Sequence, residues 1–267
     1  MQNNVTEPVR LRDIWPEFER SVPNDSVAAD VIFQALERAG KTICRCSSVR
    51  IIRTPGSRKF KCTECRYETW FTANTLLNKV SNLRGWLAAI YLKQNRVVVT
   101  PSQLARLAEI SPTGAAEIQK KLNVVVCSEM PDDSLFVRSE FFLDAICKRS
   151  RETPARMHPV SEEVTASTDA LPHVTSEGES DSSSYISPLP FKFIAVAIAF
   201  IKRHCQGVSR KYLQLYLAGF VFQINPSERA SDALLLSCLA HPPISYQNLL
   251  DYVTTPMVQF PFIFSFS

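Results

Sequence analysis

The chain has 267 residues, 45% of them hydrophobic, which is enough for one large or two small globular domains with a real core. Its net charge of +4 hides a segment from Lys41 to Lys121 with 15 Lys/Arg against 4 Asp/Glu, an excess of +11 that favours a polyanionic partner over a merely solvated surface. The most apolar stretch, 193–201, is too short to span a bilayer, and the polar N-terminus lacks the apolar run of a signal peptide, so we expect a cytoplasmic protein with no membrane partner.

The first 40 residues form a leader and one predicted helix. Ser26 is suited to cap this helix, and Gly40 stands where a helix normally stops. Val27, Val31, Ala35 and Leu36 fall on one side. Residues 41–75 have no helical period and contain short alternating runs such as 49–53, which predict the strands of a small hairpin ribbon.

Residues 76–125 are predicted to contain a helix-turn-helix. A preceding helix carries an apolar face with helical spacing, made of Leu83, Trp86, Leu87, Ile90 and Tyr91. Thr100-Pro101-Ser102-Gln103 combines a capping Thr, Pro at the first helical position and Gln at the third. Ser111-Pro112 starts a second helix that places Ala115, Ile118 and Leu122 inside. Two short helices joined so tightly indicate this motif.

The remainder divides into four parts. We expect a helical extension at 126–150, a disordered acidic linker at 151–189 that is rich in Ser, Thr and Pro, C-terminal helices at 190–255, and a tail at 256–267. The fold class is therefore α+β and mostly α, with one small ribbon. The C-terminal helices form a separate bundle or pack back on the N-terminal module. Their apolar faces, which include Leu213, Tyr216, Phe220 and Leu235, need a cover, and a homodimer is one way to supply it.

Four of the eight cysteines are clustered as Cys44-x-Cys46 and Cys62-x-x-Cys65, with fifteen residues between the pairs. A zinc ribbon brings two such pairs together from the tips of two hairpins, so that four thiolates surround Zn²⁺ as a tetrahedron. The second pair has the usual spacing, whereas the first is one residue short and chelates with more strain. The alternative is a ribbon that persists without metal. The scattered Cys127, Cys147, Cys205 and Cys238 lie in apolar surroundings, where cysteine acts as a small hydrophobe.

The predicted DNA contacts come from two places. Basic residues surround the cysteines, with aromatic residues interleaved, and such knuckles usually lie against phosphates; they are Arg45, Arg50, Arg53, Arg58, Lys59, Lys61 and Arg66. Trp70 and Phe71, in contrast, are expected in the core. The exposed side of the second helix of the helix-turn-helix would face the major groove in the usual docking geometry, with Thr113, Glu117, Lys120 and Lys121.

Together these residues resemble the N-terminus of bacterial insertion-sequence transposases that begin with a transposase zinc-ribbon domain. The resemblance covers residues 12–125. The matching stretches are Phe33-Gln34-Ala35-Leu36, Cys46-Ser47-Ser48, Lys61-Cys62-Thr63-Glu64-Cys65, Trp70-Phe71-Thr72-Ala73-Asn74-Thr75, Trp86-Leu87-Ala88-Ala89-Ile90 and Ser102-Gln103-Leu104-Ala105. The closing helices of the same family resemble Ile201-Lys202-Arg203, 207–213 and 216–225.

Between these stretches, full-length members of the family hold an RNase H-like core whose three acidic residues bind two catalytic metal ions. Here the gap contains only residues 126–189, and its aspartates in a foldable setting are Asp132, Asp133 and Asp144. By register, the last catalytic Glu of the family corresponds to Ala195, and a further acid to Gly219. The resemblance therefore implies no catalytic residue in this chain.

The resulting interpretation is a DNA-binding protein derived from a transposase. It would bind double-stranded DNA through its zinc ribbon and helix-turn-helix, near the nucleoid, without strand transfer and without being an enzyme. The alternatives are a truncated or diverged transposase that is still active in DNA transposition, a non-functional remnant, and an adaptor protein whose ribbon is purely structural.

Overall fold

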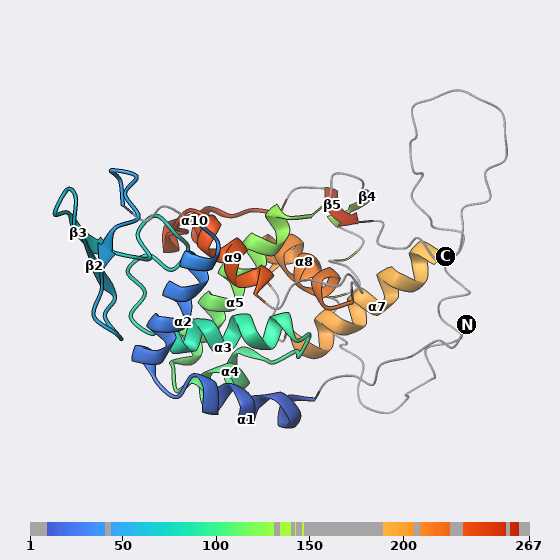
Figure 1. The fold of residues 1–267 in the computed structure, drawn as a ribbon. Helices are drawn as coiled ribbons and strands as arrows, with labels where there is room; N and C mark the ends of the chain where they lie inside the picture. Colours follow the sequence, from blue (N-terminus) through green and yellow to red (C-terminus); the bar gives the residue numbers. More distant parts are fainter. Residues whose placement is uncertain are drawn as a thin grey trace, which may run out of the picture.

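The structure, a computed structural model, describes residues 10–40, 44–130, 134–139, 142, 146, 189–205, 209–224, 232–254 and 257–261. Helices form most of this part of the chain, and a three-stranded antiparallel ribbon projects from one end of the helical body (Figure 1). The predicted class, α+β and mostly α, is confirmed. The predicted linker at 151–189 lies outside the described residues except for Leu189, where a helix begins.

Two helices open the described chain, α1 (Leu11–Ser21) and α2 (Asp25–Arg38). The predicted cap of α2 is wrong by two residues, because the Asn24 side chain, not that of Ser26, accepts the Val27 N–H at 3.0 Å. Gly40 lies just beyond the helix with φ +62°, as expected for a residue that ends one. The predicted face is also only partly right, since Val27 and Val31 are half-buried while Ile32 is buried. The reason is that α2 packs against two elements, α3 and α9, rather than one.

The ribbon consists of β1 (Ile51–Ile52), β2 (Lys59–Cys62) and β3 (Glu68–Trp70), in the order β1-β2-β3 with antiparallel pairing. Along β2 exposed and buried residues alternate, so Phe60 and Cys62 face the core while Lys59 and Lys61 face solvent. The hairpin predicted from the alternating run at 49–53 is confirmed, although its strand β1 covers only Ile51–Ile52. Phe71 is buried and Trp70 half-buried, as expected for core residues.

The predicted helix-turn-helix consists of α4 (Pro101–Ala108) and α5 (Pro112–Ser128), preceded by α3 (Leu83–Gln94). Both predicted caps are present. The Thr100 hydroxyl accepts the Gln103 N–H at 3.2 Å while the Gln103 side chain accepts the Thr100 N–H at 2.8 Å, and the Ser111 hydroxyl accepts the Gly114 N–H at 3.0 Å. Glu109 ends α4 in the left-handed conformation, which turns the chain at once into α5. The inward residues predicted for α5 are buried.

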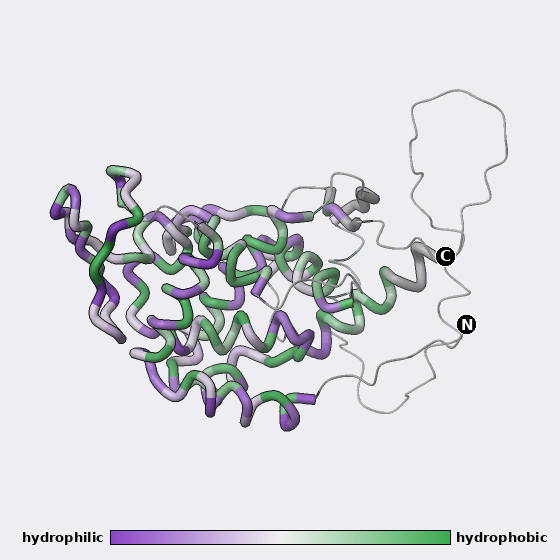
Figure 2. Tube along the Cα trace, in the orientation of Figure 1, coloured by the Kyte–Doolittle hydropathy of each residue, from purple (hydrophilic) through white to green (hydrophobic). Residues whose placement is uncertain are grey.

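Helix α3 lies at the centre of the body. Four of the five residues predicted on its inner face are buried, and the fifth, Tyr91, is half-buried. Ala88 and Leu92, on other sides of the helix, are buried as well, because α3 packs against helices on several sides. Figure 2 shows hydrophobic residues running along the helices of the body, whereas the ribbon carries more hydrophilic ones.

The C-terminal half contains α7 (Leu189–His204), the short 3₁₀-helix η2 (Arg210–Tyr212), α8 (Leu213–Ile224), α9 (Ala233–Ala240) and α10 (Tyr246–Asp251). A second, two-stranded sheet pairs β4 (Ser134–Arg138) with β5 (Met257–Pro261). The segment at 126–150, predicted as a helical extension, thus contains a strand at 134–138, and a second strand lies in the predicted tail. The run at 135–137 is too short to show a period, and its partner strand lies more than a hundred residues later in the chain.

The C-terminal helices pack back on the N-terminal module, which was one of the two predicted arrangements. Helix α8 lies along α5 and joins two hydrophobic clusters: Ala218 and Phe222 belong to the main core, and Leu217 and Phe220 to a second one with α7. Leu213, Phe220 and Leu235 are buried and Tyr216 is half-buried. One chain thus covers the face that motivated the predicted homodimer, so that argument for self-association no longer applies.

Candidate metal centre and basic ribbon surface

The sulfur atoms of Cys44, Cys46, Cys62 and Cys65 all lie within 4.8 Å of one another, so these four cysteines can hold a metal ion. The Sγ–Sγ distances are 3.3 Å from Cys46 to Cys44, 3.4 Å from Cys44 to Cys65 and 3.5 Å from Cys46 to Cys62. A tetrahedral Zn²⁺ with Zn–S bonds of about 2.3 Å has S–S edges of about 3.8 Å. These three distances are a few tenths of an ångström shorter, and the other pairs lie within 4.8 Å, so small side-chain rotations suffice to fit such an ion.

The two cysteine pairs differ in spacing, but each is followed by a residue with the same backbone conformation. The residue after each pair, Ser47 and Arg66, has a left-handed backbone, with φ +62° and +57°. In the short pair the Ser47 N–H donates to the Cys44 carbonyl at 3.0 Å, and in the long pair the Cys62 N–H donates to the Tyr67 carbonyl at 2.9 Å. A left-handed step turns the chain sharply, and it costs a residue other than glycine about 1–2 kcal/mol. Strain after each pair therefore accompanies the convergence of the sulfurs.

The protein environment distinguishes two of the thiols. Backbone N–H groups of Cys65 and Glu64, helped by hydrogen bonds from other cysteines, lower the pKa of Cys62 to about 6 against the opposing effect of burial. The Cys46 N–H lowers the pKa of Cys44, but burial and the neighbouring thiols outweigh it and raise that pKa to about 12. Cys44 and Cys62 are buried, and Cys46 and Cys65 are exposed. The centre therefore faces the core on one side and solvent on the other.

Two of the predicted DNA contacts, Arg53 and Arg58, form ion pairs within the fold. The Arg53 side chain is only 8% exposed, forms an ion pair with Asp30 (Nη2 to Oδ1, 2.7 Å) and stacks over Phe33 with its guanidinium 4.6 Å from the ring centroid. Arg58 pairs with Asp25 and donates to the Val80 carbonyl at 2.6 Å. Their carboxylate partners lie on α2, so these arginines fix the ribbon to the helical body.

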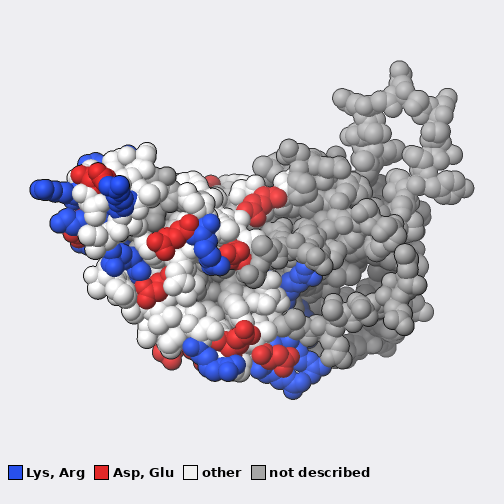
Figure 3. Space-filling model, viewed as in Figure 1, with Lys and Arg blue, Asp and Glu red and all other residues white. Residues whose placement is uncertain are grey.

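The other predicted cations of the ribbon are exposed: Arg45, Arg50, Lys59, Lys61 and Arg66. Arg50 pairs with Glu64 at 3.0 Å and Lys59 with Glu68 at 3.2 Å, and Arg45 lies over the Tyr67 ring at 4.1 Å. Within the described part of the chain, Lys61 and Arg66 form no ion pair. Lys and Arg side chains gather at the ribbon end of the molecule in Figure 3. We call these five cations, beside the cysteine cluster, the ribbon surface.

The side of α5 that was predicted to face the DNA groove has fewer exposed side chains than expected. Thr113 is exposed, but the Lys121 side chain is only 13% exposed and pairs with Glu117 at 2.7 Å. Lys120 is half-buried, with its ammonium 4.5 Å from the ring centroid of Tyr212. The expectation that Lys121 is exposed is wrong, and Lys120 packs on a residue just before α8. The cause is the docking of the C-terminal segment on α5, which nothing in the local pattern of α5 indicates.

Sequence reasoning missed the carboxylates that hold the ribbon in place. Asp30 accepts a hydrogen bond from the Gly56 N–H at 2.8 Å in addition to its ion pair with Arg53, and Asp25 accepts the Arg84 N–H at 2.8 Å. Both partners of Asp30 are more than twenty residues away in the chain, so no local motif marks the contact. An available signal was the placement of two acids on the first turns of a helix that directly precedes a basic segment.

Comparison with models of protein families, with curated proteins and with solved structures finds no match to this chain. None of the described helices combines the length and the apolar character that crossing a membrane requires.

Proposed function

We propose that this protein binds double-stranded DNA through a zinc-bearing ribbon and its helix-turn-helix, and that it derives from an insertion-sequence transposase without carrying out strand transfer. The observation that carries the proposal is the ribbon surface, where five exposed cations surround a four-cysteine centre. Clustered cations of this kind displace condensed counterions from phosphates. The proposed place of action is the nucleoid.

Zinc is the metal we propose. Four thiolates that lie within 4.8 Å of one another suit Zn²⁺, and a closed site of this kind is structural rather than catalytic. In such a centre the ion fixes the fold of the ribbon and so the positions of Arg45, Lys61 and Arg66 around it. The exposed amino-terminal end of α5, with Thr113, would make the second contact with DNA, in the major groove.

A salt titration of binding to duplex DNA tests the proposal. The logarithm of the binding constant should fall linearly with the logarithm of salt concentration, by about 0.9 for each phosphate contacted. In the double variant K61A/R66A the slope should become shallower by about 2. Arg12→Ala is the matched control, because Arg12 is exposed and lies on α1, away from the ribbon. Salt-independent binding, no binding, or equal effects of the two variants would contradict the proposal.

One observation favours a second candidate, an adaptor whose ribbon binds protein. Strand β1 is an edge of the sheet, Ile52 on it is 65% exposed, and Val49 just before it is 79% exposed. An apolar edge strand can pair with an extended peptide. Ile52→Lys should abolish such an interaction while leaving the salt dependence of DNA binding intact or stronger, so this variant separates the two functions.

A further alternative, an active transposase, is tested by strand nicking with Mg²⁺ or Mn²⁺. Asp132, Asp133 and Asp144 lie outside the described residues. Our proposal expects no metal-dependent cleavage, and cleavage that is lost in variants of Asp132 or Asp133 would overturn it.

A further inference from the structure

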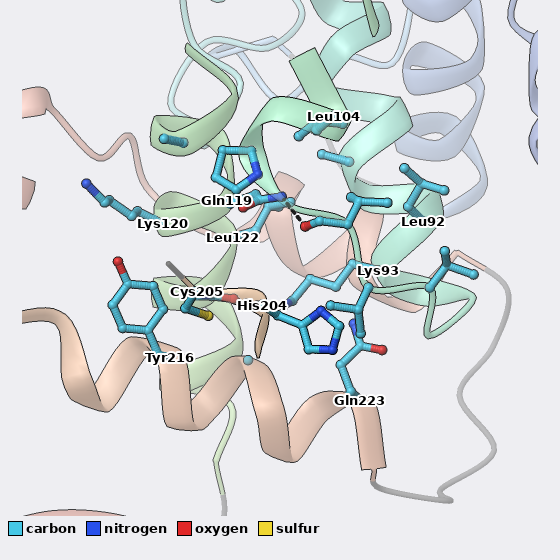
Figure 4. Close-up of a pocket in the computed structure, with 18 of the residues that line it drawn as sticks. Leu92, Lys93, Leu104, Gln119, Lys120, Leu122, His204, Cys205, Tyr216 and Gln223 are labelled. Carbon is cyan, nitrogen blue, oxygen red and sulfur yellow. Dashed lines mark hydrogen bonds between the residues drawn. The ribbon is translucent and has the colours of Figure 1, made fainter. Parts of the chain in front are cut away.

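A cavity of about 120 Å³ lies between the helix-turn-helix and the C-terminal helices (Figure 4). On one side its wall comes from α3 and α5, with Leu92, Lys93 and Gln119. On the other side it comes from the end of α7 and from α8, with His204 and Gln223. The space is therefore at the contact between the two halves of the sequence, and neither half encloses it alone.

Lys93 brings a positive charge to this cavity without an acid to balance it. Its ammonium donates to the Asn123 side-chain carbonyl at 2.7 Å and lies 5.4 Å from the ring centroid of Phe222. Among the described residues it forms no ion pair, and none of those that line the cavity is acidic. An ammonium has three N–H donors, and toward the described residues this one donates to a single partner, the neutral Asn123 side chain.

The position of Lys93 is fixed by a close approach of two helices. A Cβ on Gly219 of α8 would lie 2.9 Å from the Asn123 Oδ1, so a larger residue at this position would displace the Asn123 side chain that contacts Lys93. Asn123 in turn holds the Lys93 ammonium. In Figure 4, Lys93 extends toward His204 and Cys205 inside the cavity, whereas Lys120 extends away from them.

Gln223 adds an unsatisfied acceptor. Within the described chain its side-chain oxygen is buried and has no hydrogen-bond partner. A buried polar atom without a partner usually costs free energy that a ligand or a water can recover. The cavity therefore offers a cationic donor at Lys93 and a neutral acceptor at Gln223, which together specify an anion that also carries a donor.

We infer that this cavity binds a small anion with a hydrogen-bond donor of its own, such as a short hydroxycarboxylate or hydrogen phosphate, with the anionic oxygen on Lys93 and the donor on Gln223. Cavities of about 150 Å³ hold a benzene-sized molecule, so about five heavy atoms fit here. Burial lowers the pKa of Lys93 to about 8, against the opposing influence of the Cys205 and Cys238 thiols, so the ammonium is still protonated at neutral pH. Lys93 and Gln223 come from opposite halves of the chain, so the anion would strengthen the docking of α8 on α5.

Calorimetric titration of the full chain at constant ionic strength tests this inference without reference to DNA. The probes are glycolate, its near-isostere propionate, and inorganic phosphate. We expect saturable binding of glycolate and phosphate at a stoichiometry of one, a rise in Tm, and binding of propionate weaker by roughly tenfold, because propionate has a methyl group where glycolate has its hydroxyl. Absence of saturable binding of both glycolate and phosphate would overturn the proposal.

Three variants assign the site. Lys93→Met should weaken glycolate binding by roughly ten- to a hundredfold, the range expected for a lost charge-assisted hydrogen bond. Gln223→Leu should remove the preference for glycolate over propionate. The matched control is Lys79→Met, because Lys79 is an exposed lysine outside both the cavity and the ribbon surface, and this variant should bind glycolate like the wild type. Each fold is verified by its melting curve, with Lys93→Gln used if Lys93→Met does not fold. Undiminished binding after loss of the Lys93 charge would place the anion elsewhere and refute the assignment.

Discussion

The ribbon and the helical body use the same basic residue types in opposite ways. On the ribbon, Lys61 and Arg66 are exposed around a cysteine centre. In the body, Lys121 is 13% exposed in an ion pair, and Lys93 contacts Asn123 inside a cavity wall. The local excess of +11 that pointed to DNA is therefore divided between a surface that can meet phosphates and cations that hold helices together. A charge count shows that cations are present, and only packing shows which of them are free to bind.

The ribbon and the helical body also differ in what stabilises them, because the ribbon has few buried residues of its own. It depends on the four cysteines, on the α2 carboxylates and on Phe60, whereas the body is built on a continuous apolar core. The two regions should consequently respond to different perturbations. The following variants are ordered from the largest expected effect to the smallest.

Cys62→Ser should produce the largest effect, because it should unfold the ribbon and leave the helical body folded. Structural zinc in small cysteine sites contributes apparent binding free energies of about 10 kcal/mol or more, and loss of one buried thiolate ligand removes most of it. If the cysteines hold zinc as proposed, we expect loss of that zinc and unfolding of the ribbon, with the far-ultraviolet signal of the helices retained. Metal analysis and circular dichroism give the two readings. Cys127→Ser, outside the cluster, is the control and should keep its zinc. Full zinc content in Cys62→Ser would show that the metal is held elsewhere.

Asp30→Ala should detach the ribbon from α2. It removes the ion pair to Arg53 and the acceptor of the Gly56 N–H, and it leaves a guanidinium that is 8% exposed without its partner. Because the Asp30 side chain is 31% exposed and solvent screens the pair on that side, we expect a cost of about 3 kcal/mol, the lower end of the range for buried pairs. Chemical denaturation measures the loss. Glu68→Ala breaks the exposed pair with Lys59 and should cost under about 1 kcal/mol. Equal effects of the two variants would mean that Arg53 does not anchor the ribbon.

The Asp30 contact also has a defined pH dependence. The Gly56 N–H, together with Arg53 and against the effect of burial, lowers the pKa of Asp30 below its ordinary value of 3.8. Because the folded protein holds this proton less tightly than the unfolded chain, the contact contributes fully above pH 3.8 and is lost as pH falls through the lower folded value. The stability difference between wild type and Asp30→Ala should therefore shrink under acid conditions below pH 3.8 and stay constant near neutrality.

Lys93→Met should stabilise the protein, in contrast to Asp30→Ala, because it removes a charge that burial disfavours. The pKa of Lys93 is lowered from 10.5 to about 8, which corresponds to a stabilisation of up to about 3 kcal/mol on removal of the charge. The folded protein releases this proton more readily than the unfolded chain does. The advantage of the variant is thus complete below pH 8 and diminishes between pH 8 and 10.5. Denaturation in anion-poor buffer measures it, and a destabilised variant at pH 7 would show that the lysine is held by more than Asn123.

Local signals in the sequence were sufficient for elements whose contacts are local. Thr100 and Gln103 form their reciprocal cap three residues apart, and Cys62 and Cys65 form their turn within four residues. Distant contacts were not predictable in this way. Lys121 has the spacing of an exposed helical residue, and only the packed chain shows its small exposed fraction. Likewise, β4 has no partner until β5 arrives from the far end of the chain. Asn24 was missed for another reason, because Asn and Ser are nearly equivalent as caps.

The smallest effects are expected for two glycine substitutions on the ribbon. They distinguish residues that affect the stability of the ribbon from residues that bind DNA. Ser47 and Arg66 follow the two cysteine pairs with φ +62° and +57°, where glycine is relaxed. Ser47→Gly and Arg66→Gly should each stabilise the zinc-loaded protein by about 1 kcal/mol. Thr54→Gly, at an exposed turn position without positive φ, should instead destabilise it slightly. Only Arg66→Gly removes an exposed cation, so only that variant should lower the salt slope of DNA binding, by about 1. Equal slopes for Ser47→Gly and Arg66→Gly would remove Arg66 from the DNA contact while leaving the backbone argument intact.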